Sequence, residues 1–157
     1  MLELRLSELA QSLGVACERG DAVLTGLAID SRAVKPGDLF VAIDGEHVDG
    51  HDFIDKALDS GAAAIACTRA IDIAAPHIKT TDPHQVCAIY GQLIRDRFHG
   101  SVIGITGSAG KTTAKSFLES ICGLAGATVA TLGNQNNEIG VPLTLARLSA
   151  DPTFAVV

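Results

Sequence analysis

The chain has 157 residues, of which 47% are hydrophobic and 19% charged, with a formal net charge of −6. This length fits one domain, or one domain and part of a second. An acidic chain without basic clusters argues against a nucleic-acid surface. No apolar run approaches the ~18 residues that a membrane span needs. The four cysteines lack C-x-x-C spacing, which favours a reduced, cytoplasmic protein.

The first 98 residues predict an alternation of strands and helices. Pro36-Gly37 predicts a turn, and Asp82-Pro83 predicts a helix start, because Asp caps helices and Pro fits the first helical position. The expected helices are 8–13 (capped by Ser7), 52–60 (ending at Gly61) and 83 to about 98. The expected strands are 23–29, 39–43, 62–67 and 78–80.

A domain boundary is predicted at His99-Gly100, where a new strand begins. Strand 101–105, helix 112–124 and strand 127–131 then form the first βαβ unit of a second, mostly parallel sheet. Residues 153–157 predict one further strand. The expected fold class is therefore α/β, with a small amino-terminal α/β domain followed by the beginning of a P-loop domain.

The segment Gly107-Ser108-Ala109-Gly110-Lys111-Thr112-Thr113 joins a predicted strand to a predicted helix. Small residues let backbone N–H groups turn toward a polyphosphate, and the helix N-terminus adds positive potential. Lys111 would reach the phosphates, and the Thr112 hydroxyl would reach Mg²⁺. The general P-loop pattern needs Gly where Ile105 stands, so the alternative is a glycine-rich turn with an exposed lysine.

That departure from the general pattern resembles the ATP loop of the Mur ligases, which form amide bonds in peptidoglycan synthesis. Residues 131–142, Thr-Leu-Gly-Asn-Gln-Asn-Asn-Glu-Ile-Gly-Val-Pro, are similar to a segment of the members that add D-alanyl-D-alanine to a UDP-muramoyl tripeptide. Ile29-Asp30-Ser31-Arg32, the run from Pro36 to Ala42, Gly45 and the run from Asp49 to Phe53 are similar to the family's amino-terminal UDP-binding domain. The three resemblances span roughly residues 25 to 148.

The resemblance implies two domains and a set of site residues. Residues 1–98 would bind the UDP substrate, and residues 99–157 would be the first part of the ATP-binding domain. Gly107 through Thr113 would bind ATP, with Thr112 as a Mg²⁺ ligand. The implied contacts of the UDP-muramoyl substrate are Ser31, Glu46, His47, Val48, Asn134, Asn136 and Asn137. The asparagines could instead serve only a loop with left-handed backbone positions.

The implied reaction is carboxylate activation by ATP. The γ-phosphoryl group passes to the terminal carboxylate of the UDP-muramoyl peptide, and the amine of D-alanyl-D-alanine displaces the phosphate. Further metal ligands and a carboxy-terminal domain are expected beyond Val157, so this chain alone is expected to be inactive. Two alternatives stay open: a ligase that adds the third amino acid to a UDP-muramoyl dipeptide, and a noncatalytic nucleotide-binding module.

Several polar residues near the implied uridine site have simpler interpretations. Asp30 and Arg32 are expected to pair with each other. His47, Asp49 and His51 could form a metal cluster, but polar residues in a glycine-containing turn are expected to be solvated instead.

Position within the sheet supports the uridine site. Ser31 follows one apolar strand, and residues 46–48 follow another. If these strands are parallel neighbours, both segments emerge at the same sheet edge, where α/β ligand sites tend to form. Because residues 1–98 carry 9 Lys/Arg and 15 Asp/Glu, against 3 of each in residues 99–157, the diphosphate is expected nearer the second domain.

Overall fold

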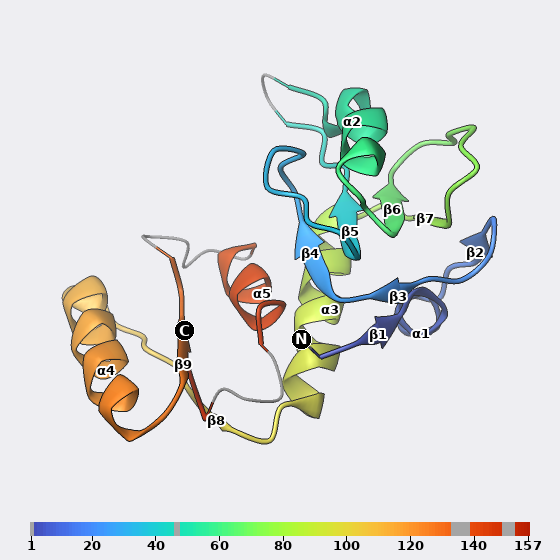
Figure 1. Cartoon of the computed structure of the whole chain (residues 1–157). Helices are drawn as coiled ribbons and strands as arrows, with labels where there is room; N and C mark the ends of the chain where they lie inside the picture. The colour runs from blue at the N-terminus through green and yellow to red at the C-terminus, as the bar shows by residue number, and fades with distance from the viewer. Residues whose placement is uncertain (1, 46–47, 133–138, 149–152) are drawn as a thin grey trace.

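The computed structural model describes residues 2–45, 48–132, 139–148 and 153–157 (Figure 1). Its first half is a five-stranded sheet in the order β2-β7-β6-β5-β4. The strands are β2 Cys17–Glu18, β4 Gly26–Ala28, β5 Asp38–Val41, β6 Ala64–Cys67 and β7 His77–Lys79. All neighbours are parallel except β2 and β7. A separate antiparallel pair joins β1 Leu4–Arg5 to β3 Val23–Leu24.

Helices cover both faces of the five-stranded sheet. They are α1 Leu6–Leu13, the short 3₁₀ helix η1 Gly50–Phe53, α2 Ile54–Asp59 and α3 Pro83–Arg97. Side chains alternate between the two faces along each strand. Leu39 and Val41 of β5 therefore pack in one core cluster with α1 and α3, whereas Phe40 packs in a second cluster with α2. Buried runs of this kind are typical of a parallel sheet covered on both sides.

The second half holds a three-stranded parallel sheet in the order β8-β10-β9. Its strands are β8 Ser101–Ile103, β9 Thr128–Ala130 and β10 Phe154–Val156, and its helices are α4 Lys111–Ala125 and α5 Gly140–Leu145. The mixed α/β class with parallel sheets is thus confirmed. None of the helices in the described ranges has the length and hydropathy of a membrane span.

The two halves share a hydrophobic core across the predicted boundary at residues 98 and 99. Helix α5 packs directly on α3 (Figure 1). A Cβ atom at Gly91 of α3 would lie only 2.9 Å from the Cα of Pro142 in α5. Leu148 and Ala155 belong to the same cluster as Leu39. The division into domains therefore stays a prediction, because the segments on either side of it are packed together.

Three local predictions are wrong. The expected strand 23–29 is two strands with different partners, because the Thr25 N–H donates to the Gly37 carbonyl between them. Ser7 does not cap α1, since its N–H and hydroxyl both donate to Asp21 and the helix already begins at Leu6. The helix expected over residues 52–60 is divided in two: the 3₁₀ helix η1 begins at Gly50, where the Asp49 carboxylate accepts the His51 N–H, and the α-helix α2 begins only at Ile54.

The predicted cap of α3 is confirmed. The Asp82 carboxylate accepts the N–H groups of His84 and Gln85, at 2.9 and 3.2 Å, and Pro83 is the first helical residue.

Candidate functional site

The glycine-rich loop lies between β8 and α4, as expected from the sequence. Gly110 stands immediately before the helix with a left-handed backbone, φ 77°, and no side chain caps α4 in this part of the structure. The first backbone N–H groups of α4 are therefore available to an anion, and the helix dipole adds positive potential at this end of the helix. The Lys111 ammonium folds back and donates to the Gly107 carbonyl at 2.5 Å. Thr112 and Thr113 are exposed.

This arrangement fits a bound polyphosphate. An uncapped helix end and a loop of small residues present N–H donors, and one cation is held beside them. The Lys111 contact to Gly107 is a contact to a neutral carbonyl, so the ammonium can turn toward a phosphate without breaking an ion pair. The Thr112 hydroxyl is an oxygen donor of the kind that Mg²⁺ accepts.

A second site lies at the carboxyl ends of β4 and β5. These strands are parallel neighbours with Ala28 opposite Phe40, as the argument from sequence position required. A cavity of about 490 Å³, called here the carboxyl-edge pocket, opens at this edge. It is lined by Ile29, Asp30, Ser31, Arg32, Phe40, Ile43, Val48, Gly50, Phe53 and Lys56. Two of the predicted uridine contacts, Ser31 and Val48, are therefore brought together.

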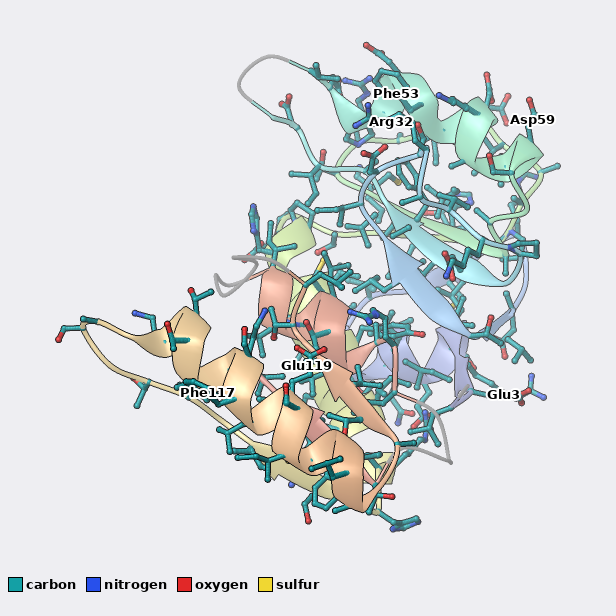
Figure 2. All side chains as sticks on the ribbon, turned by 60° about the vertical axis from the view of Figure 1, so that its left-hand side comes forward. Glu3, Arg32, Phe53, Asp59, Phe117 and Glu119 are labelled. Carbon is teal, nitrogen blue, oxygen red and sulfur yellow. The ribbon has the colours of Figure 1, made fainter. Side chains whose placement is uncertain are left out.

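The residues that line this pocket are mostly apolar or aromatic, and Asp30, Ser31, Arg32 and Lys56 are the polar ones. Ser31 is buried, with 7% of its surface exposed. Figure 2 shows Arg32 and Phe53 near each other beside the sheet. A few polar groups set into apolar and aromatic walls are typical of pockets for small molecules.

Asp30 and Arg32 form an ion pair, which confirms the interpretation made from the sequence. Arg32 Nε and Nη2 donate to the two carboxylate oxygens, the closer at 2.7 Å. The side-chain and backbone hydrogen bonds from Arg32 lower the pKa of Asp30 to about 2. Asp30 therefore carries its negative charge at neutral pH and holds the guanidinium at the pocket's rim.

The expectation that Asp49 and His51 are solvated turn residues is wrong for His51. Its side chain is only 2% exposed, and its Nδ1 lies 2.6 Å from the Asp49 carboxylate. The two residues bind each other. Within the described ranges, no three His, Cys, Asp or Glu side chains are grouped to hold a metal ion.

Comparison with known proteins identifies the family. The model of the "Mur ligase family, catalytic domain" matches residues 23–107, and that of the "Mur ligase middle domain" matches residues 105–157. The chain belongs to the Mur ligase family.

Curated Mur ligases of two kinds are similar to this chain. The UDP-N-acetylmuramoyl-tripeptide–D-alanyl-D-alanine ligase of Escherichia coli is 37% identical over 157 residues, which is 100% of this chain and 35% of that protein. The ligase of the same name from Synechocystis is 38% identical over 87% of this chain and 31% of its own length. A UDP-N-acetylmuramoyl-L-alanyl-D-glutamate–2,6-diaminopimelate ligase of Listeria innocua is 36% identical over 87% of this chain and 29% of its own. The chain spans about a third of the length of the relatives that it matches.

Solved Mur ligases share the fold. A MurF from Acinetobacter baumannii superimposes with a TM-score of 0.82 at 31% identity, over 94% of this chain and 34% of that one. MurF from Thermotoga maritima in complex with ADP gives a TM-score of 0.71 at 34% identity, over 83% of this chain and 31% of its own.

The remaining predicted contacts lie outside the described residues. These are Glu46, His47, Asn134, Asn136 and Asn137. Their assignments, like those of Ser31, Val48 and the residues from Gly107 to Thr113, stay predictions for this Mur ligase chain.

Sequence reasoning missed part of the pocket lining. Phe40, Ile43 and Lys56 were not among the predicted uridine contacts: the first two were expected in a buried strand and Lys56 in a helix. The rule that ligand sites form at carboxyl strand ends could have pointed to Ile43. Lys56 gave no comparable signal, because a charged residue on the polar side of a helix is most often simply solvated.

Proposed function

We propose that this chain supplies the UDP-substrate-binding part and the beginning of the ATP-binding part of a Mur ligase that joins D-alanyl-D-alanine to a UDP-N-acetylmuramoyl tripeptide. Residues 1–98 bind the UDP end of the substrate, and residues 99–157 begin the ATP-binding domain. The similarity to two ligases of this name over most or all of the chain supports the choice of reaction. The free cysteines at 17, 67, 87 and 122 are compatible with work in the reducing cytoplasm.

The observation that carries the proposal is the carboxyl-edge pocket. Ser31 and Val48 were assigned to the uridine from their place in the sequence, and both line one cavity of about 490 Å³. A flat heterocycle fits against aromatic and branched walls such as Phe53 and Val48, while the Ser31 hydroxyl offers one directional hydrogen bond. Glu46 and His47 belong to the same proposed contact set.

At the other site, the glycine-rich loop binds the ATP phosphates. The polyphosphate accepts hydrogen bonds from the backbone N–H groups of residues 107–110 and of the first turn of α4. Thr113 lies in that first turn and belongs to the same proposed contact set. Lys111 turns from the Gly107 carbonyl to the phosphates, where a positioned cation favours phosphoryl transfer. When bound, Mg²⁺ held partly by Thr112 would supply further charge neutralisation. Asn134, Asn136 and Asn137 are proposed to approach the muramoyl part of the substrate.

Binding to the two sites can be tested separately. UDP and Mg-ADP are titrated into the chain by calorimetry, and amide chemical shifts are mapped by NMR. UDP should shift the amides of Ser31 and Val48, and Ser31→Ala should weaken UDP by about fivefold, the value of one hydrogen bond of about 1 kcal/mol. Lys111→Ala should weaken Mg-ADP and leave UDP unchanged.

Two results would count against the proposal. If UDP shifted only residues 107–113 while Ser31 stayed silent, UDP would be a mimic of ATP in the loop and the uridine assignment would be wrong. Tighter binding of a UDP-muramoyl dipeptide than of the tripeptide would favour the related ligase that adds the third amino acid. The similarity to the Listeria innocua ligase is the reason to test this alternative.

A further inference from the structure

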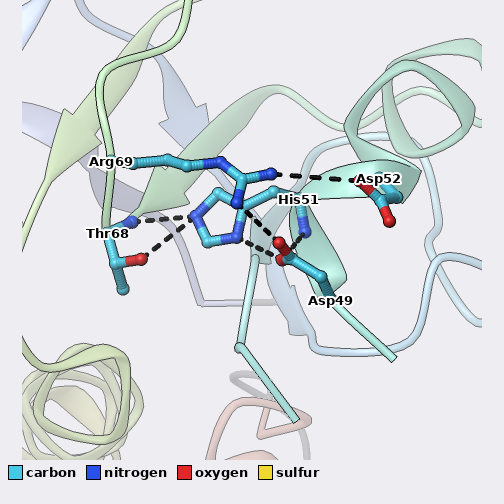
Figure 3. A network of polar contacts seen from close by, with 5 residues as sticks. All are labelled: Asp49, His51, Asp52, Thr68 and Arg69. Atoms are coloured by element: carbon cyan, nitrogen blue, oxygen red, sulfur yellow. Dashed lines mark hydrogen bonds and ion pairs between the residues drawn. The ribbon is translucent and has the colours of Figure 1, made fainter. Parts of the chain in front are cut away.

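A network of polar contacts includes Asp49 and His51, the two sequence neighbours of the pocket-lining Gly50 (Figure 3). Asp49 accepts the backbone N–H of His51 at 2.8 Å and lies 2.6 Å from its Nδ1 through the same oxygen. Its other oxygen accepts from Arg69 at 2.6 Å. On the far side of the ring, the Thr68 N–H donates to His51 Nε2 at 3.0 Å. The buried imidazole thus joins the segment after β5 to the segment after β6.

We propose that His51 is a positioning residue for the uridine site, and that it acts with Asp49 and Arg69 to hold the wall of the carboxyl-edge pocket. The inference rests on the proposed function of that pocket. Val48 and Gly50 line the pocket, whereas His51, Asp49 and Arg69 do not. The network therefore acts on a ligand only through the wall.

The described residues of this wall and its flank, Asp44, Gly45 and 48–50, make few backbone hydrogen bonds across the turn. The Gly50 N–H donates to the Ile43 carbonyl at 2.9 Å, and the Gly45 N–H donates to the Val48 carbonyl at 3.1 Å. A single bridge pairs Asp44 with Asp49. A pairing as short as this one contributes little stability by itself. Asp49 and His51 add side-chain bonds from this segment to Arg69 and Thr68, which follow β6.

The hydrogen bonds specify one state of the imidazole. Nε2 accepts the Thr68 N–H, so it carries no proton, and the proton on Nδ1 is donated to Asp49. The bonds from His51 and Arg69 lower the pKa of Asp49 to about 2, so the carboxylate is charged at neutral pH. Asp52 adds a second, longer contact to Arg69 at 3.9 Å. Charge-assisted hydrogen bonds of this kind are about twice as strong as neutral ones.

The chain offers matched controls for both side chains. His77 is also a buried histidine, 3% exposed, with one carboxylate partner, Glu18 at 3.3 Å, but it lies on β7 away from the pocket. Arg19 is an exposed arginine paired with Asp72 at 3.5 Å, and it too lies away from the pocket. Any loss caused only by removing a buried imidazole or a surface ion pair should appear in the controls as well.

The experiment compares His51→Asn with His77→Asn and Arg69→Ala with Arg19→Ala. UDP and Mg-ADP affinities are measured by calorimetry, and exchange of the Gly45 and Gly50 amides is measured by NMR. We expect His51→Asn to weaken UDP about tenfold, since a charge-assisted bond is lost, and Arg69→Ala to weaken it less. Both should speed exchange at Gly45 and Gly50. Mg-ADP affinity should be unchanged, and the controls should bind UDP as the wild type does.

Arg69→Ala keeps the test valid if His51→Asn does not fold, because Arg69 is 56% exposed. Unchanged UDP affinity and unchanged Gly50 exchange in a folded variant would overturn the inference. So would an equal loss of UDP binding in His77→Asn. If the wild type binds no UDP, the proposed function is wrong. Amide exchange then decides alone whether the network holds the wall.

Discussion

Gly50 is a residue of the carboxyl-edge pocket at which one added methyl group should have a large effect on stability. A Cβ atom there would lie 2.7 Å from both the N and the O of Ile43 and 3.2 Å from the carbonyl carbon of Ala42. These are backbone atoms just after the end of β5, so no side-chain rotation can relieve the contact. Gly50→Ala must therefore move the segment and stretch its 2.9 Å hydrogen bond to Ile43. Overpacking and the weakened bond together should cost about 2–4 kcal/mol.

Gly123 is the matched control for Gly50. It lies within α4 and is exposed, and a Cβ atom added there would have no heavy atom within 4 Å outside the helix's own nearby backbone. Gly123→Ala should stabilise the chain by about 0.5–1 kcal/mol, because alanine favours the helix. The two substitutions are chemically identical and should have opposite signs.

Urea unfolding followed by circular dichroism measures both effects. With a slope near 2 kcal/mol/M, Gly50→Ala should lower the midpoint by about 1–2 M, and Gly123→Ala should raise it slightly. Because Gly50 lines the carboxyl-edge pocket, UDP affinity should fall only in the first variant. A Gly50→Ala chain as stable as the wild type, with UDP affinity intact, would refute the packing argument.

Three further predictions concern stability at low pH, the hydrophobic core shared by the two halves, and the charge of the carboxyl-edge pocket. Asp30 and Asp49 both have pKa values lowered from 3.8 to about 2, so their hydrogen bonds stabilise the fold above about pH 4 and are lost as the pH falls toward 2. The urea midpoint of unfolding should therefore drop between about pH 4 and pH 2, and it should drop less steeply in Asp49→Asn. Leu148→Ala, at a fully buried site, should cost about 2–5 kcal/mol and lower a single unfolding transition, whereas an unchanged first-half transition would show independent halves. Lys56→Gln should weaken UDP about twofold to fivefold and leave uridine unchanged in calorimetry, and equal effects on both ligands would exclude a contact with the diphosphate.

The order of elements could be predicted from the sequence because it depends on local patterns. Asp82-Pro83 contains its own cap, and the apolar runs at β5 and β6 are buried on both faces, as such runs usually are in parallel sheets. Strand partners are a different matter. Residues 23–29 are mostly apolar and predict one strand, yet the chain changes partner at Thr25, whose N–H donates to the Gly37 carbonyl. Nothing within that short segment encodes a neighbour that comes so much later in the chain.

The same limit explains the outcome for His51. Glycine and acidic neighbours in the turn predict solvent exposure, and the sequence gives no sign that Thr68, 17 residues away, will lie against the ring. The pocket could be predicted better, because parallel neighbouring strands end at the same edge of a sheet, and this rule was enough to place Ser31 and Val48 together. The place of Ser31 and Val48 depended on the pairing of β4 with β5 alone, and the sequence was enough to predict it. The burial of His51 depends on its contacts with both Asp49 and Thr68, and the sequence was not enough.

Net charge is the feature for which the structure changes the interpretation most. The acidic total of residues 1–98 argued against a diphosphate there and moved the expected anion site toward residues 99–157. Yet Arg32 and Lys56 both line the carboxyl-edge pocket, and among the described residues Asp30 is the one acidic side chain that does so. Exposed charges beyond about 10 Å are largely screened at physiological salt. Asp30 is paired with Arg32, and this ion pair holds the guanidinium beside the carboxyl-edge pocket. The local balance in the described part of the pocket is therefore set by two cations and one paired carboxylate, and a total summed along the chain does not describe the field that a ligand meets.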